Sequence, residues 1–544
     1  MTDPETGGGT ADDETVSGGA PGGGTAAGDA ALAGPARGIA DGYAFTGPAL
    51  DLGALLWDGA CHPGAQVRVP LPMLNRHGLV AGATGTGKTK TLQLIAEQLS
   101  AQGVPVFLAD VKGDLSGISR PGPGGDRVTA RAAETGQEWT PSGFPVEFLA
   151  LGGIGHGIPV RATVTSFGPV LLSKVLGLNR TQEQSLGLIF HYADTKGLEL
   201  IDLKDLRAVV AFLTSDEGKP ELKGIGGLST ATAGVILRSL TAFEAQGMAD
   251  FFGEPEFDTA ELLRTAPDGR GVVSVLELAA VQDKPVLFST FLMWLLADLF
   301  HDLPEAGDLD KPKLVFFFDE AHLLFHDASD AFLDAITQTV RLIRSKGVGV
   351  FFVTQTPKDV PSDVLGQLGN RVQHALRAFT PDDQKALRAT VKTFPDSPYD
   401  LEELLTGLGT GEAVVTVLSE TGAPTPVAAT RLRAPESLMG PVDAAELDRA
   451  VRESPLHERY AQAVDRESAF ERLSAREAEA APEKPPVVKG EARGGGRKKA
   501  PAEEPSLVEQ VVGSGMFKSL ARSVGTQLGR EITRSLFGTA RRRR

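Results

Sequence analysis

Hydrophobic positions follow two periods in this chain, and the two alternate along much of its length. Short apolar runs, typical of buried strands, lie at 77–80, 104–109, 271–276, 314–318 and 348–353. Between them, apolar residues recur every three or four positions at 90–100, 285–302 and 329–346, which predicts helices. Strands that alternate with helices predict an α/β protein with a doubly wound, mainly parallel sheet.

Other stretches break this alternation. Residues 166–265 have helical periodicity throughout, which predicts a helical insertion in the sheet domain. Residues 112–165 are rich in Gly and Pro and are predicted to be a loop with short strands. Apolar runs at 370–379, 412–418 and 427–432 are predicted to extend the sheet.

Composition sets the remaining boundaries. The N-terminal end is rich in Gly, Ala, Thr and acids and has few large apolar side chains, so it is predicted to be disordered until near Tyr43. The predicted parts are a disordered N-terminus (1–38), the first part of the core (39–165), the insertion (166–265), the second part of the core (266–440), a charged helical segment (441–480), a linker (481–505) and a basic amphipathic C-terminal helix (506–544).

Charge and cysteine content narrow the class of protein. The formal net charge of −16 argues against a generally basic protein that coats nucleic acid, but not against DNA binding inside a ring. Cys61 is the single cysteine, so no internal disulfide is possible, and no signal peptide is apparent. The most apolar long stretch, 288–300, contains Asp298 and is too short to cross a bilayer. We expect a cytoplasmic protein with no integral membrane segment.

Residues 82–89 read GATGTGKT, a complete G-x-x-x-x-G-K-[ST] phosphate loop between a predicted strand and a predicted helix. Its glycines let backbone N–H groups point at phosphate oxygens, and the helix N-terminus adds partial positive charge. Lys88 is predicted to reach the β- and γ-phosphates, and Thr89 to hold Mg²⁺. The predicted ligands of ATP are Gly82, Ala83, Thr84, Gly85, Thr86, Gly87, Lys88 and Thr89.

Two further strands end in residues suited to phosphoryl transfer. In LVFFFDE, Asp319 is predicted to hold Mg²⁺ and Glu320 to orient and deprotonate the attacking water. Gln355 follows the next strand, where a γ-phosphate sensor is expected. A helix-capping Asp and a strand-terminating turn are the alternatives for these two sites.

A cation on the transferred phosphate, often an arginine from a neighbouring subunit, assists such a reaction. Arg371 and Arg377 are the best candidates, and Arg341 and Arg344 are weaker ones. Each is equally compatible with a role in a surface ion pair.

Together, GATGTGKT, ADVKGDLSG, LVFFFDEAHLLF, RSKGVGVFFVTQTPKDVP and LGNRVQHALRAF resemble the HerA and FtsK group of P-loop motor ATPases. DRESAFERL and SLARSVGTQLGREITRSLFG, nearer the C-terminus, resemble the bacterial HerA-like YjgR family more closely. The resemblance implies a RecA-like core, a homo-oligomeric and usually hexameric ring, and ATP-driven movement along double-stranded DNA. It supports the roles given to Lys88, Thr89, Asp319, Glu320 and Gln355. It also favours either Arg371 or Arg377 as the arginine that acts on a neighbouring subunit.

The C-terminal end has a charge of its own. Residues 483–544 carry 14 basic and six acidic side chains. The amphipathic helix predicted there would contact DNA, an anionic membrane surface or another subunit, or pack on its own domain. The predicted function is a Mg²⁺-dependent DNA translocase or helicase. An ATP-regulated assembly or scaffold protein, and a motor for other substrates at the membrane, are the alternatives.

Overall fold

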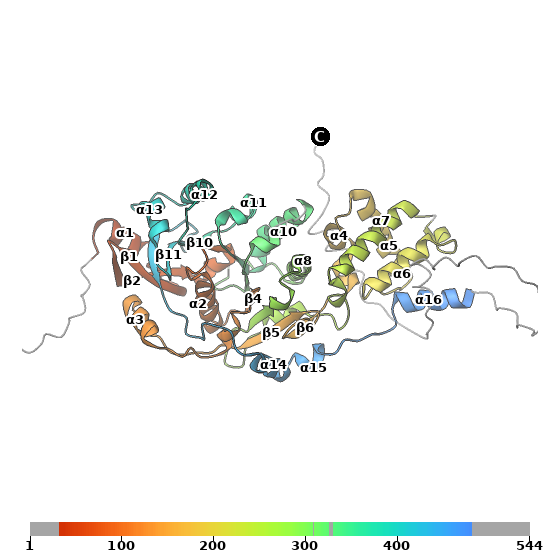
Figure 1. Ribbon diagram of the computed structural model, residues 1–544, viewed down its shortest axis with the longest axis horizontal. Helices are drawn as coiled ribbons and strands as arrows, with labels where there is room; N and C mark the ends of the chain where they lie inside the picture. Colours follow the sequence, from red (N-terminus) through yellow and green to blue (C-terminus); the bar gives the residue numbers. More distant parts are fainter. Residues whose placement is uncertain (1–31, 223, 308, 326–329, 481–544) are drawn as a thin grey trace, which may run out of the picture.

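A single large sheet organises the described part of the chain (Figure 1). The computed structural model describes residues 32–480, apart from 223, 308 and 326–329. Twelve strands form the sheet, in the order β2-β1-β12-β11-β10-β3-β9-β8-β4-β7-β5-β6. Helices pack on both faces, so the predicted α/β class with a RecA-like, doubly wound, mainly parallel sheet is confirmed.

The strands from β10 to β6 in this order are mutually parallel, and the other four are antiparallel to their neighbours. The parallel strands are β3 (Gly78–Ala81), β4 (Val106–Asp110), β5 (Val146–Leu151), β6 (Ile158–Val160), β7 (Val273–Glu277), β8 (Leu314–Phe318), β9 (Val348–Thr354) and β10 (Asn370–His374). The antiparallel strands are β1 (Ala49–Trp57), β2 (Ala60–Pro70), β11 (Glu412–Thr416) and β12 (Ala428–Leu432). Parallel strands bring their carboxyl ends to one edge of the sheet, where ligands bind in this class of fold.

Strand β8 shows why the strand sequences are continuously apolar. Leu314, Phe316 and Phe318 belong to the hydrophobic cluster on one face of the sheet, whereas Val315 and Phe317 belong to the cluster on the other. Both faces of a parallel sheet are covered, so each residue of the strand needs an apolar side chain.

The helices predicted from periodicity cover these two faces. Helix α2 (Lys88–Ala101) packs on one face through Leu92, Ile95 and Leu99. Helices α8 (Pro285–Asp302) and α10 (Asp330–Ile343) contribute to the cluster on the opposite face. The sheet core is therefore three layers thick around the phosphate loop, which lies between β3 and α2.

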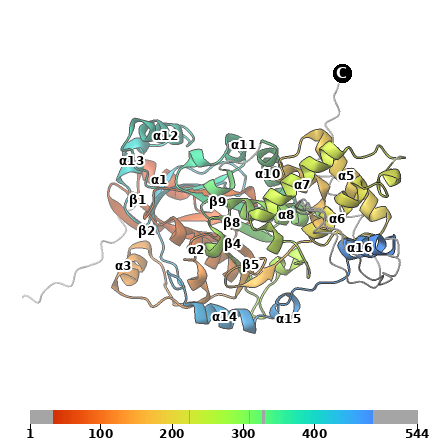
Figure 2. The same cartoon turned by 45° about the vertical axis from the view of Figure 1, so that its right-hand side comes forward.

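The helical insertion lies beyond β6, at the end of the molecule opposite the β1–β2 hairpin (Figures 1 and 2). It contains α4 (Val164–Val175), α5 (Arg180–Thr195), α6 (Leu203–Thr214) and α7 (Thr230–Ala245). The final part of the predicted range 166–265 contains the short 3₁₀ helices η4 (Met248–Asp250) and η5 (Thr259–Leu263) in place of α-helices. In the sequence, this insertion separates the two parts of the sheet domain.

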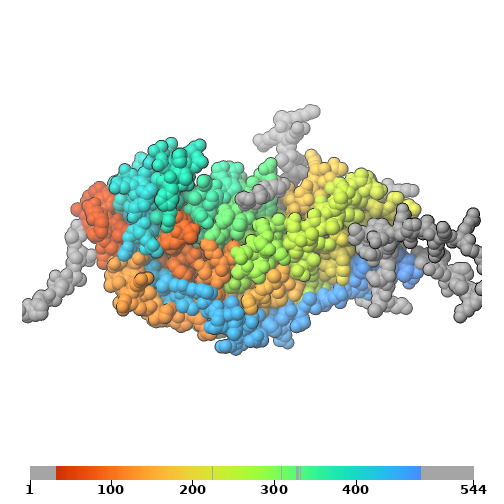
Figure 3. Space-filling view, in the orientation of Figure 1, coloured from red at the N-terminus to blue at the C-terminus, as the bar shows by residue number. Residues whose placement is uncertain are grey.

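Residues 441–480, here named the C-terminal strap, run along one side of the core to the insertion (Figure 3). The strap contains α14 (Ala444–Glu453), α15 (His457–Tyr460) and α16 (Ala469–Ala480), which packs on α6. The fully buried Asp205 of α6 joins the two. Its carboxylate accepts the backbone N–H groups of Ile201 at 2.9 Å and Phe470 at 2.9 Å, and it contacts the Ser468 hydroxyl.

Two predictions differ from the structure in the first part of the chain. Helix α1 (Gly34–Asp41) begins inside the range 1–38 that was predicted to be disordered, because Pro35 starts the helix and Ala36 and Ile39 are buried against the sheet domain. Residues 1–31 lie outside the described part of the chain. The range predicted as a loop with short strands, 112–165, contains α3 (Asp126–Thr135) as well as β5 and β6.

Other predictions differ around β10. The strand predicted over 370–379 ends at His374, because the next residues cross over the phosphate loop, where Ala83 N donates to Ala375 O at 2.8 Å. The helices α12 (Pro381–Val391) and α13 (Leu401–Gly407) were not predicted. The short helices α9 (His322–Phe325) and α11 (Ser362–Leu365) complete the α-helices of the described residues.

The predicted linker (481–505) and basic C-terminal helix (506–544) lie outside the described residues. Within residues 32–480, apart from the gaps given above, no helix has the length and apolar character needed to span a bilayer.

We predict that Asp205→Ala loosens the attachment of the strap. The substitution leaves several buried backbone N–H groups without an acceptor, which we expect to cost about 2–4 kcal/mol. Thermal unfolding and limited proteolysis of the strap measure the effect. The control is Asp216→Ala, which removes an exposed carboxylate 3.4 Å from Lys219 and should change stability little. Equal proteolysis of the two variants would contradict the role of Asp205.

Candidate active site

The phosphate loop joins β3 to α2 through glycines in conformations that other residues avoid. Gly82, Gly85 and Gly87 have φ values of +154°, +80° and +110°. A β-carbon on Gly82 would lie 2.4 Å from the β-carbon of His374, at the end of the neighbouring strand β10. This loop conformation therefore requires glycine both for its backbone angles and for its close approach to β10.

Inside the loop, two side chains fold back on Ala83. The Thr86 hydroxyl donates to Ala83 O at 2.8 Å, and the Lys88 ammonium donates to the same oxygen at 3.2 Å. Lys88 is 7% exposed, and burial lowers its pKa although Glu320 opposes that effect. A buried ammonium at a helix N-terminus fits the predicted contact with phosphate. Thr89, half-buried, occupies the same first turn of α2.

Asp319 and Glu320 follow β8 and lie within reach of the charge on Lys88. Asp319 is 1% exposed, and its Oδ1 accepts the backbone N–H of Glu320 at 2.9 Å. Its Oδ2 is buried and has no hydrogen-bond partner among the described residues. Burial raises the pKa of Asp319 to about 7, although Lys112 acts in the opposite direction. A buried carboxylate oxygen without a partner fits the predicted role in Mg²⁺ binding.

Glu320 combines an ion pair to Lys112 with an unusual backbone conformation. Its φ of +48° is uncommon for a residue other than glycine and is typical of strained functional sites. The buried carboxylate contacts the Lys112 ammonium through Oε1, and its Oε2 is 3.2 Å from His322 Nδ1. The predicted base therefore begins in an ion pair within its own chain.

Lys112 was not predicted as a site residue. It lies two residues after the end of β4, in a loop fixed by the buried carboxylate of Asp110, which accepts the N–H groups of Gly113 and Leu115, each at 2.8 Å. The sequence ADVKGDLSG contained a signal for this lysine, since it follows a strand that ends at the same sheet edge. Its partner Glu320 follows from the pairing of β4 with β8.

Gln355 lies at the tip of β9, the strand between β3 and β8. Thr354 pairs with Ala81, so Gln355 follows directly beside Gly82 in register. Asp359 fixes this turn by accepting the hydroxyls of Thr354 at 2.8 Å and Thr356 at 3.0 Å. The Gln355 side chain is exposed at the predicted sensor position.

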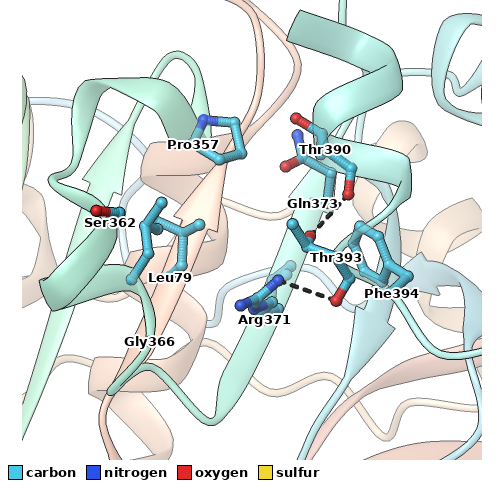
Figure 4. A pocket seen from close by; sticks show the side chains of 11 residues that line it. Leu79, Pro357, Ser362, Gly366, Arg371, Gln373, Thr390, Thr393 and Phe394 are labelled. Carbon is cyan, nitrogen blue, oxygen red and sulfur yellow. Dashed lines mark hydrogen bonds between the residues drawn. The ribbon is translucent and has the colours of Figure 1, made fainter.

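Arg371 and Arg377 have different environments. Arg371 pairs with Leu79, roughly 10 Å along β3 from Gly82. It lines a cavity of about 290 Å³ and donates to Thr393 O at 3.2 Å (Figure 4). Arg377 is exposed in the segment after β10, the segment that Ala83 contacts through Ala375 O. Arg377 is thus exposed two residues after a contact with the phosphate loop, whereas Arg371 donates to a carbonyl of its own chain.

Glu277 is a further buried acid at this sheet edge, and it was not predicted as a site residue. It ends β7 directly opposite Asp110 of β4, is 8% exposed, and its Oε1 has no hydrogen-bond partner among the described residues. Burial, together with the charge of Asp110, raises its pKa to about 8. Four neighbouring strand ends therefore carry Gln355, Asp319, Asp110 and Glu277 along one edge.

Three features define the class of this protein: a glycine-rich loop before a helix, an acid pair at the end of a nearby parallel strand, and a polar residue at the end of the strand between them. Together they are typical of a P-loop nucleoside triphosphatase with a RecA-like core. The chain belongs to the HerA-like family. The family model described as "Helicase HerA-like C-terminal" matches residues 58–544, which confirms the predicted resemblance to HerA-like proteins.

Two curated relatives are similar in sequence to part of this chain. A probable helicase, MJECL08 of Methanocaldococcus jannaschii, is 31% identical over 153 residues, which cover 26% of this chain and 28% of that protein. The DNA double-strand break repair helicase HerA of Sulfurisphaera tokodaii is 29% identical over 149 residues, which cover 27% of this chain and 29% of that protein. The chain thus matches less than a third of the length of either relative.

Among solved structures, the bacterial conjugative coupling protein TrwB is similar, with a TM-score of 0.47 and 15% identity. The similarity covers 74% of this chain and 93% of that chain.

We predict that Glu277→Gln stabilises the protein at alkaline pH. The folded-state pKa of Glu277 is raised, so its stabilising contribution is fully present below the ordinary pKa of Glu and is lost as pH rises to about 8. A glutamine cannot ionise, so the variant should be more stable than the wild type by about 2–4 kcal/mol at about pH 9 and unchanged at about pH 5.

Thermal unfolding of both proteins at the two pH values measures this difference. Glu305→Gln is the control, because Glu305 is exposed and its pKa is lowered. A stability difference between wild type and Glu277→Gln that does not change with pH would contradict the prediction.

Proposed function

We propose that this chain is an ATP-hydrolysing motor of the HerA/FtsK type that acts on double-stranded DNA as a translocase or helicase. The observation that carries the proposal is the buried acid pair near the phosphate loop, in which Asp319 Oδ2 has no hydrogen-bond partner within the part of the chain that the structure describes. This pattern supports metal-assisted phosphoryl transfer to water better than simple nucleotide binding, because a binding site has no need of a buried second carboxylate.

Each residue has a role in this proposal. Lys88 and the loop N–H groups bind phosphate oxygens, and Thr89 and Asp319 hold Mg²⁺, which neutralises phosphate charge when it is bound. Glu320 accepts a proton from the attacking water at its carboxylate. Gln355 orients that water. Glu320 must first exchange its contact with Lys112 for the water molecule, so Lys112 influences when the base is available.

We also propose that the chain forms a homo-oligomeric ring, and that this ring is a hexamer, as the resemblance to the HerA and FtsK group implies. Arg377 is exposed two residues after the contact of Ala375 with the phosphate loop, and Phe379, two residues later, is 81% exposed. An exposed aromatic side chain next to a cation is typical of interface residues. We therefore favour Arg377 over Arg371 as the arginine that reaches a neighbouring subunit's site.

Double-stranded DNA is proposed as the track because the relative from Sulfurisphaera tokodaii is a DNA double-strand break repair helicase. The net charge of −16 confines a DNA contact to a locally basic surface, such as the inside of a ring. A cytoplasmic location accompanies this function.

We expect purified protein to hydrolyse ATP in the presence of Mg²⁺ and to do so faster with duplex DNA. Glu320→Gln should lower kcat by about a hundredfold or more and keep nucleotide affinity, because the base is lost and the phosphate site remains. Lys88→Ala should weaken nucleotide binding itself. Steady-state phosphate release and nucleotide titration measure both effects.

The matched control is Lys385→Ala, at an exposed position on α12. Turnover that survives Glu320→Gln undiminished would refute the assignment of the base. An ATPase that neither binds duplex DNA at low salt nor responds to it would favour the scaffold alternative.

Arg377→Ala is predicted to lower kcat by roughly 10³-fold, whereas Arg371→Ala should retain most turnover. If Arg377 acts on the neighbouring subunit, mixing inactive Arg377→Ala with inactive Glu320→Gln should partly restore turnover, because some mixed interfaces then combine an intact arginine with an intact base. Phosphate release from mixed rings, verified by size and subunit labelling, measures this. Mixed rings without any restored turnover would contradict an arginine shared between subunits.

A further inference from the structure

We infer that the nucleoside half of the nucleotide binds in a cavity of about 200 Å³ beside the phosphate loop, in contact with α3 and the segment after β12. This rests on the proposed function and extends it from the phosphates to the base and ribose. The cavity is smaller than the roughly 300 Å³ at which small-molecule pockets usually begin. That size suits part of a ligand whose remaining part lies in an adjoining site.

The cavity and the phosphate loop share residues. Gly87, the last residue before α2, and Thr91, in the first turns of α2, both line the cavity. Thr91 also lies against the core, with its hydroxyl 2.9 Å from His374 Nε2. A molecule bound by the loop N–H groups therefore has the cavity as its immediate neighbour.

The order of strands gives the bound nucleotide a direction. On one side of β3 lie β9 and β8, which carry Gln355, Asp319 and Glu320. On the other side lie β10, β11 and β12, and the cavity is lined by the turn before β11 and the segment after β12. A triphosphate that directs its γ-phosphate to the acids therefore directs its α-phosphate and nucleoside to the cavity.

The walls suit an aromatic base. Val128 of α3 and Pro435 are buried and line the cavity, and Met439 at its rim is 40% exposed. A methionine sulfur packs favourably against aromatic rings. Burial of a base here would cover apolar surface that the protein otherwise leaves in water.

Arg131 holds these walls together before any ligand binds. One of its terminal nitrogens, Nη1, donates to Gly411 O and Leu432 O, each at 3.0 Å, and Nη2 donates to Thr410 O at 3.3 Å. This side chain thereby ties α3 to two other segments, the turn at 410–411 and the end of β12. A preformed wall lowers the entropic cost of binding.

The hydrogen-bond donors on the cavity wall suit adenine and guanine equally. Arg433 directs its terminal nitrogens to Asp51 at 3.0 Å and Gln66 at 2.8 Å, and its buried Nε has no partner among the described residues. Arg127 is exposed at the cavity. Of these two, the exposed Arg127 presents donors to a ligand, and adenine and guanine alike carry the N7 acceptor. We therefore expect GTP to bind nearly as well as ATP.

The test compares ATP, GTP and tripolyphosphate, which has no nucleoside, by calorimetric titration of the full chain with Mg²⁺. Val128→Phe fills the cavity and should weaken ATP binding at least about tenfold, and Met439→Ala, on an exposed side chain that folding does not require, about threefold. Tripolyphosphate binding should be unchanged in both variants. Val464→Phe, at an exposed position outside the cavity, is the matched control.

The outcomes separate this inference from the proposed function. ATP affinity that is unchanged in both wall variants, or that falls equally with tripolyphosphate affinity, would overturn the nucleoside site while Lys88→Ala still weakens both ligands. GTP affinity more than about a hundredfold below that of ATP would overturn recognition by shared purine features. If wild type binds neither ATP nor tripolyphosphate, the proposed function fails and the nucleoside site with it.

Discussion

Burial of carboxylates at one sheet edge is the constraint on which the site depends. Asp110, Glu277 and Asp319 end neighbouring strands, and burial raises the pKa of each. The chain satisfies Asp110 with backbone N–H groups and one oxygen of Glu320 with Lys112, but leaves one oxygen each of Asp319, Glu320 and Glu277 without a hydrogen-bond partner among the described residues. Such a cluster costs folding free energy, and functional sites are where proteins retain that cost.

The parallel sheet makes this concentration of acids possible because it separates apolar strands from polar strand ends. Strand β8 buries every side chain from Leu314 to Phe318 and then ends in two acids. The rigid core fixes the positions of these acids relative to Gly82, since β9 pairs with both β3 and β8. Positions that catalysis requires are thus set by packing many residues away from the chemistry.

Local patterns determined how much could be predicted from sequence. The phosphate loop, β8 with its acids and helix α8 were predicted because each is encoded by consecutive residues. The contact of Lys112 with Glu320 could not be, since it depends on the pairing of β4 with β8 across about two hundred intervening residues. Helix α3 was missed because the stretch around it is rich in Gly and Pro, and the different exposure of Arg371 and Arg377 depends on packing that local sequence does not encode.

His374 connects the phosphate loop to the segment that carries Arg377. Its side chain packs against Gly82 and contacts the Thr91 hydroxyl, and burial lowers its pKa to about 4, so it stays neutral and its contacts persist across physiological pH. The next residue, Ala375, accepts the N–H of Ala83 in the loop. Because the chain between these contacts and Arg377 is only a few residues long, the position of that arginine depends on the conformation of the loop.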